Sequence, residues 1–120
     1  MYNRRQSVRV PVSARGAITA DGYDYPCRLL DLSAEGVGTT RPLGMSCSTG
    51  LYCEVHMFDL PGIADVQLGA ELVYIAGERL GFRVIKIPQW ATAPLKSIIS
   101  QSAIDNALVY DRRARLDYDG

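Results

Sequence analysis

The chain has 120 residues, of which 48% are hydrophobic and 22% are charged, and its 13 basic residues balance its 13 acidic ones. A chain of this length and composition is expected to fold as one domain around its own hydrophobic core, without help from disulfides or metals. The zero net charge argues against a protein that grips duplex DNA or RNA along its length, because such domains are usually strongly basic.

A local cluster of basic residues lies at the amino terminus. Arg4, Arg5 and Arg9 all precede the first acidic residue, Asp21. Arginine binds anions with two parallel hydrogen bonds and stacks on flat rings, which lysine cannot do. We expect residues 1–12 to form a flexible basic arm that runs into the first strand, and to become ordered when an anion binds.

Residues 8–90 alternate between apolar and polar side chains, a pattern typical of strands. The strand-like runs are "VRVPVSARGAIT" (8–19), "YDYPCRLLDLS" (23–33), "VGTT" (37–40), "LYCEVHMF" (51–58), "ADVQLGAELVYI" (64–75) and "ERLGFRVIKI" (78–87). Pro11 suggests a sheet edge or a bulge in the first run, and Asp21-Gly22 is a strong hairpin turn. Six or seven short strands joined by tight turns predict a closed antiparallel barrel over residues 8–90.

The pattern changes after Pro88. The apolar residues then follow the spacing of one helical face: Leu95, Ile98, Ile99, Ala103, Ala107 and Tyr110. This spacing predicts a helix over residues 92–115, with Thr92 as its N-cap and Pro94 in its first turn, followed by a polar tail over 116–120. We expect this helix to close one end of the barrel or to pack on its wall, with Trp90 as a packing anchor.

The segment "LLDLSAEG" (29–36) places polar residues inside an apolar run. Strand alternation predicts that Leu30 and Leu32 face the core while Asp31 and Ser33 point outward together. Gly36 would let the following turn adopt a positive φ or admit a ligand close to the backbone. The alternative is an ordinary turn in which Asp31 and Ser33 bond nearby backbone amides.

Two arginines whose charge is complementary to Asp31 lie four residues apart, at Arg5 and Arg9. Arginine forks bind phosphate and the O6/N7 edge of guanine, and a carboxylate such as Asp31 accepts from the donor edge of guanine. The arginine spacing is common by itself, so a solvated basic tail is the alternative.

Taken together, RxxxR at Arg5–Arg9 and (D/N)xSxxG at Asp31, Ser33 and Gly36 resemble the signature motifs of the PilZ domain family, bacterial receptors for cyclic di-GMP. The run "ELVYIAGERLGFRVIKI" is similar to the last hairpin of that family. The resemblance implies a mainly β fold, a six-stranded antiparallel barrel with a C-terminal helix. It also implies that these five residues bind cyclic di-GMP, the arginines at guanine and phosphate and Gly36 at a close backbone approach.

Two further positions take their meaning from the resemblance. An arginine just before RxxxR, here Arg4, is similar to family members that hold two mutually intercalated cyclic di-GMP molecules. Tyr74 lies where some relatives carry an aromatic residue near the ligand, although a half-buried barrel tyrosine is the simpler interpretation. The output implied is interaction with an unidentified downstream protein rather than chemistry.

The sequence also weighs against other functions. The single histidine, His56, and the three cysteines have no metal-site or nucleophile spacing, so we expect neither a metal nor an enzyme. The sequence carries no secretory leader or membrane span, which favours a cytoplasmic protein without membrane insertion. A single-strand nucleic-acid barrel would need a basic, aromatic groove, so DNA and RNA are not expected partners. A PilZ-like adaptor that binds protein but no nucleotide remains the main alternative.

Overall fold

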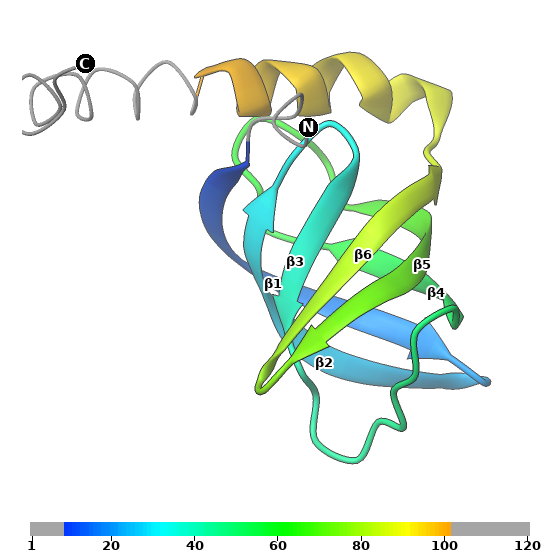
Figure 1. Cartoon of the computed structure of the whole chain (residues 1–120). Helices are drawn as coiled ribbons and strands as arrows, with labels where there is room; N and C mark the ends of the chain where they lie inside the picture. Colours follow the sequence, from blue (N-terminus) through cyan, green and yellow to red (C-terminus); the bar gives the residue numbers. More distant parts are fainter. Residues whose placement is uncertain (1–8, 102–120) are drawn as a thin grey trace, which may run out of the picture.

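The barrel predicted from the sequence is present in a computed structural model of the chain, which describes residues 9–101. Six antiparallel strands close into a barrel in the order β1-β2-β3-β6-β5-β4 (Figure 1). The strands are β1 (Val10–Ala20), β2 (Tyr23–Leu32), β3 (Gly36–Thr40), β4 (Tyr52–Met57), β5 (Val66–Ala76) and β6 (Arg79–Lys86). Both the strand number and the mainly β class agree with the expectation.

Alternation along the strands fills the barrel interior. In β4, Cys53, Val55 and Met57 are at most 1% exposed, while the residues between them lie on the outside. The hairpin between β1 and β2 turns at Asp21 and Gly22, whose φ angles are 52° and 83°. Two successive positive φ angles are typical of the two-residue turn whose twist matches that of the strands.

A helix follows β6 and lies across one end of the barrel (Figure 1). It occupies residues 89–101 of the described chain, so it begins three residues before the expected cap at Thr92. Ala91 and Leu95 are buried in the barrel core, at 0% and 6% exposed. Pro94 therefore lies in the second turn rather than the first. The expected end of the helix at 115 and the tail 116–120 lie outside the described residues.

The expected role of Trp90 is wrong. Its side chain is on the first turn of the helix but is 54% exposed. The helix starts earlier than expected, which directs Ala91 and Leu95 toward the barrel and leaves Trp90 mostly in solvent. Within residues 9–101, no helix is long and apolar enough to cross a membrane.

Candidate functional site

Asp31 is buried near the end of β2 and bound by two arginines. Its side chain is 11% exposed, whereas those of Arg9 and Arg79 are 56% and 39% exposed. Arg9 Nη1 donates to Asp31 Oδ1 at 3.1 Å, and Arg79 Nη2 donates to Asp31 Oδ2. A buried carboxylate is stable when both its oxygens accept charged hydrogen bonds. The two guanidinium groups supply these bonds from residues that are far apart in the sequence.

A β-bulge determines where Asp31 points. Leu29 pairs with Thr39 and Asp31 with Gly38, so Leu30 is an extra residue in the ladder between β2 and β3. Leu29 and Leu32 enter the core at 1% and 3% exposed, while Leu30 is half-buried. The expected assignment of Leu30 to the core is therefore wrong, because a bulge interrupts strict alternation and re-aims the side chains on either side of it.

Two glycines form the floor next to Asp31. Gly38 of β3 pairs with Asp31 on one side and with Gly81 of β6 on the other, and Gly81 pairs with Tyr74 of β5. A Cβ on Gly38 would lie 2.6 Å from Asp31 Oδ1, and a Cβ on Gly81 would collide with the Tyr74 ring. The carboxylate and the aromatic ring can therefore lie flat across the sheet because neither glycine has a side chain.

Ser33 and Gly36 make the turn between β2 and β3. Ser33 Oγ accepts from the amides of Gly36 at 3.0 Å and Glu35 at 3.3 Å, and the Ser33 amide donates to the Gly36 carbonyl at 2.9 Å. The simple turn interpretation thus describes the Ser33 contacts, but it does not describe those of Asp31.

Gly36 is needed for a close approach of two strands. A Cβ at this position would lie 2.5 Å from the carbonyl oxygen of Phe82 on β6. The glycines with positive φ lie elsewhere in the chain, so the proposed positive φ at Gly36 is not observed. The other part of the expectation, a close approach to the backbone of Gly36, is made in this structure by the neighbouring strand β6.

Arg9 links Asp31 to the turn. It lines a shallow surface pocket of about 320 Å³ together with Ser33, Glu35, Gly36, Val73, Phe82 and Arg83. Arg83 also binds Glu71 of β5, so its charge is partly neutralised. Of the residues predicted for a site, the structure brings together Arg9, Asp31, Ser33 and Gly36. Arg4 and Arg5 lie outside the described residues.

Arg79 was not among the residues predicted for the site. It begins β6, two residues before Gly81, and therefore lies on the same outer face. The sequence pattern places Arg79 in the strand-like run 78–87, and nothing in the composition of that run links it to Asp31, 48 residues away. The two-residue spacing from Gly81 was the sequence signal that could have placed Arg79 on this face.

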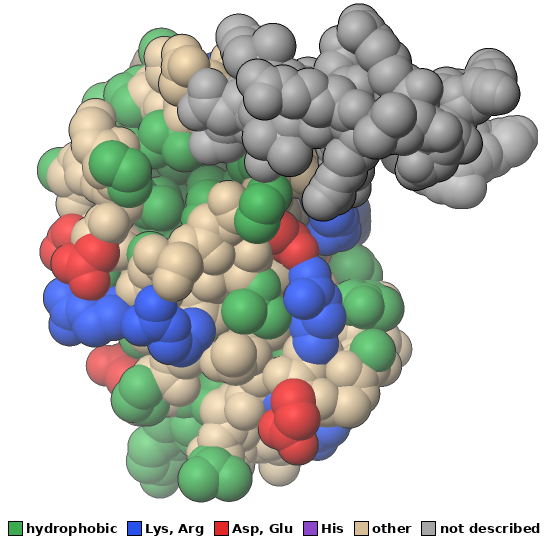
Figure 2. All heavy atoms as spheres, turned by 90° about the vertical axis from the view of Figure 1, so that its left-hand side faces the viewer, with side chains coloured by type: hydrophobic (Ala, Val, Ile, Leu, Met, Phe, Trp, Pro, Cys, Tyr) green, Lys and Arg blue, Asp and Glu red, His purple; other side chains and the backbone are tan. Residues whose placement is uncertain are grey.

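The charges on this side of the molecule do not form a continuous basic surface. Figure 2 shows Lys and Arg side chains in separate groups, with acidic side chains next to them and hydrophobic ones between. A groove that follows a nucleic-acid backbone needs a continuous basic track. The face seen in Figure 2 does not show such a track.

Comparison with known protein families gives a match over most of the chain. The model of the PilZ domain matches residues 3–100. The chain belongs to the PilZ domain family. A search of curated proteins found no match.

Solved PilZ structures have the same barrel. The PilZ domain with c-di-GMP of YcgR from Escherichia coli is 18% identical, with a TM-score of 0.70, and the match covers 91% of this chain and 98% of that one. YcgR in complex with c-di-GMP, also from Escherichia coli, is 20% identical with a TM-score of 0.70, covering 92% and 50%. The Bacillus subtilis inhibitor of motility MotI/DgrA is 14% identical with a TM-score of 0.69, covering 88% and 52%, so this chain spans about half its length.

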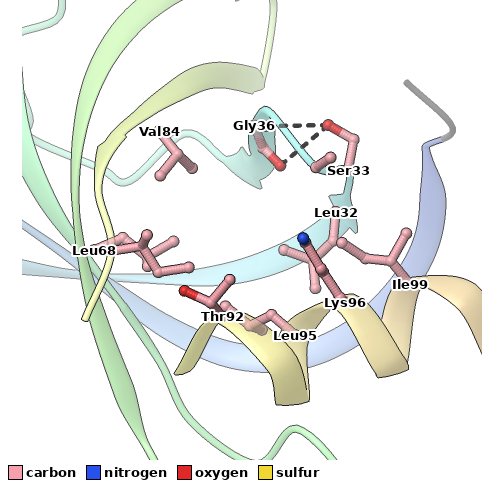
Figure 3. A pocket seen from close by; sticks show the side chains of 11 residues that line it. Leu32, Ser33, Gly36, Leu68, Val84, Thr92, Leu95, Lys96 and Ile99 are labelled. Atoms are coloured by element: carbon pink, nitrogen blue, oxygen red, sulfur yellow. Dashed lines mark hydrogen bonds between the residues drawn. The ribbon is translucent and has the colours of Figure 1, made fainter. Parts of the chain in front are cut away.

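A second pocket lies between this PilZ barrel and its C-terminal helix (Figure 3). Its volume is about 140 Å³, and its lining is mostly aliphatic: Leu32, Ala34, Leu68, Val84, Ile87, Leu95 and Ile99, with Ser33, Gly36, Thr92 and Lys96. Ser33 and Gly36 also line the surface pocket beside Arg9. The turn between β2 and β3 is therefore a shared wall of both pockets.

The single histidine of this PilZ domain is not arranged as a catalytic base. Thr19 Oγ1 donates to Asp24 Oδ1 at 2.5 Å and lies 3.1 Å from His56 Nε2. Because the hydroxyl proton is used on Asp24, His56 Nε2 must donate to Thr19 and cannot take its proton. Among residues 9–101, no group of three or more His, Cys, Asp and Glu side chains is arranged to hold a metal ion.

Proposed function

We propose that this protein is a receptor for cyclic di-GMP that signals through protein–protein interaction. The observation that carries the proposal is the cluster on the outer face of the barrel, where Arg9 meets the buried Asp31 beside the turn formed by Ser33 and Gly36. Membership of the PilZ family and the c-di-GMP named with two similar structures support it.

The chemistry of the cluster matches a guanine dinucleotide. The Asp31 carboxylate accepts from the N1–H and amino group of guanine, while arginine forks bind O6 and N7 or the phosphates. In this proposal Arg4 and Arg5 join Arg9 at the ligand, Ser33 bonds a nearby phosphate oxygen, and the backbone at Gly36 approaches the ligand closely. Arg4 supplies the extra cation needed for two intercalated molecules.

Ligand binding is proposed to be a change of shape. The part of the arm that precedes β1 folds over the barrel when its arginines meet the phosphates, and the folded arm with its nucleotide creates or masks a surface for a downstream protein. Amide hydrogen exchange in residues 1–12 should slow when cyclic di-GMP is added. Unchanged exchange at saturating ligand would contradict this switch.

Calorimetric titration tests the binding itself. Cyclic di-GMP should bind the wild type, and Arg5→Ala or Asp31→Ala should cost about 1.5–3 kcal/mol, at least tenfold in affinity, because each removes a charged partner. Arg15→Ala is the matched control, since Arg15 binds the distant, exposed Asp59. Two ligands per chain are expected, falling to one in Arg4→Ala.

One observation favours a second candidate, a PilZ-like adaptor that does not bind nucleotide. Both oxygens of Asp31 already accept from arginines in the described structure, so a nucleotide would have to share or displace these bonds. An adaptor would show no heat with cyclic di-GMP, in the wild type as in Asp31→Ala. Binding by the wild type that is lost in Asp31→Ala would exclude the adaptor.

A further inference from the structure

The two arginines on Asp31 differ in how they are held. Arg9 immediately precedes β1 and is more than half exposed. Arg79 is the first residue of β6, paired with Thr40 of β3 and Ala76 of β5, and its side chain is 39% exposed. The backbone of Arg79 is therefore held between two barrel strands, while Arg9 lies where the barrel meets the arm.

The two arginines also take different oxygens of the carboxylate. Arg9 binds Oδ1, the oxygen over Gly38, and Arg79 binds Oδ2. Removing the only cation that pairs with a buried carboxylate is costly in free energy, because the negative charge is then both out of water and unpaired. With Arg79 on Oδ2, Arg9 can leave Oδ1 and the carboxylate remains paired.

We propose that Arg79 is a positioning residue that holds Asp31 while a guanine replaces Arg9 at Oδ1. This inference rests on the proposed function. Arg79 fixes the plane of the carboxylate across Gly38 and keeps it compensated, so Oδ1 can accept from guanine while the Arg9 fork moves to the ligand. Without Arg79, Arg9 becomes the sole ion-pair partner of Asp31 in the described structure and is retained there.

Selectivity for guanine over adenine can be measured, and a change in fold stability alone does not alter it. Adenine lacks the N1–H and 2-amino donors that a carboxylate at Oδ1 would accept from. The ratio of affinities for cyclic di-GMP and cyclic di-AMP therefore measures how well Asp31 is positioned. A residue that merely stabilised the barrel would change the unfolding midpoint and leave this ratio unchanged.

The test is calorimetric titration of the full chain with both dinucleotides. Arg79→Met keeps the aliphatic stem and removes the charge, so we expect at least tenfold weaker binding of cyclic di-GMP and a lower guanine preference. Arg79→Lys keeps one charged bond to Asp31 and should lose less affinity, about threefold to tenfold. Arg15→Met, at the distant pair with Asp59, is the control and should bind like the wild type.

The outcomes separate the two proposals. If the wild type binds cyclic di-GMP and both Arg79 variants bind within twofold of it with the same preference for guanine, the positioning role is wrong and the receptor function stands. If the wild type does not bind, the receptor function fails and this role fails with it. Should Arg79→Met not fold, Arg79→Lys decides, because wild-type affinity and selectivity in that variant contradict the role.

Discussion

At the scale of single residues, Gly38 determines how Asp31 can lie. Its missing side chain lets the carboxylate cross the sheet toward Arg79, and Gly81 does the same for the ring of Tyr74. Both glycines lie on the outer face, where a larger residue would meet solvent in an ordinary barrel. Their role is to let neighbouring side chains lie flat on the sheet.

Gly38→Ala should therefore weaken ligand binding more than it weakens the fold. The new Cβ would lie 2.6 Å from Asp31 Oδ1, so the carboxylate must move and its bonds to both arginines must change. We expect tenfold or greater loss of cyclic di-GMP affinity by calorimetry, with about 1–3 kcal/mol lost in urea unfolding.

Gly81→Ala is the matched comparison for that variant. Its Cβ collides with the Tyr74 ring rather than with Asp31, so the carboxylate keeps its geometry. If Gly81→Ala lowers cyclic di-GMP affinity as much as Gly38→Ala does, the effect does not come through Asp31. Stacking of a base on Tyr74 would then be the better explanation.

The buried thiols predict a pH dependence at the same scale. Burial raises the pKa of Cys27 and of Cys53 from the ordinary value of 9.0 to about 11. The unfolded state releases these protons first, so the free energy of unfolding should fall as the pH rises from about 9 to about 11. Urea midpoints at pH 8 and pH 10.5 should differ less in Cys53→Ala than in the wild type. The same difference in both proteins would contradict the raised pKa of Cys53.

Local sequence rules predicted some of these residues and missed others for physical reasons. The grouping of Arg9 with the Asp31 and Ser33 turn was predicted and is observed, because the motifs are short and flank one hairpin. Leu30 was misassigned because a bulge depends on the partner strand, which alternation within one strand does not report. Arg79 was missed because its contact with Asp31 crosses β3 and joins two strands that are distant in the sequence.

At the scale of elements, the C-terminal helix is attached by its small and aliphatic residues. Ala91 and Leu95 are buried against the barrel end, and Ile98 and Ile99 pack against the core, whereas Trp90 is exposed. The apolar spacing predicted a helix correctly, but its first turn depends on tertiary contact. Ala91 makes that contact, and alanine gives no strong signal in an apolar pattern.

Leu95 and Trp90, the two largest apolar residues near the start of the helix, should therefore contribute unequally to stability. Leu95→Ala should lower the free energy of unfolding by about 2–4 kcal/mol, because it removes buried methyl groups next to an existing pocket. Trp90→Ala should cost less than about 1 kcal/mol, since its ring is largely in solvent. Urea titration of both variants measures the difference, and a larger cost at Trp90 would mean that the ring packs in solution.

At the scale of the whole molecule, balanced charge and a closed barrel favour a small, defined ligand over a polymer. The chain has zero formal net charge, and the basic groups on the face seen in Figure 2 are interrupted. The barrel and helix were predictable because period-two and helical spacing persist over long segments. The contacts between distant strands were not, because they depend on register.

Competition binding tests this whole-molecule argument. Unlabelled single-stranded RNA at a hundredfold excess should not displace cyclic di-GMP, whereas unlabelled cyclic di-GMP should. Raising the salt concentration should weaken cyclic di-GMP binding moderately, because exposed arginines such as Arg9 are screened. Displacement by RNA would instead indicate a nucleic-acid surface.

The first half of β1 has a consequence for how copies of this chain meet one another. Pairing of β1 with β4 runs from Gly16 to Thr19, whereas Val10, Pro11 and Ala14 pair with β2 on one side alone. This segment carries Pro11, which has no N–H, and a bulge before Ala14 that bends the chain. Both features make it a poor template for a strand from another molecule, so this segment resists strand exchange and fibrillar stacking.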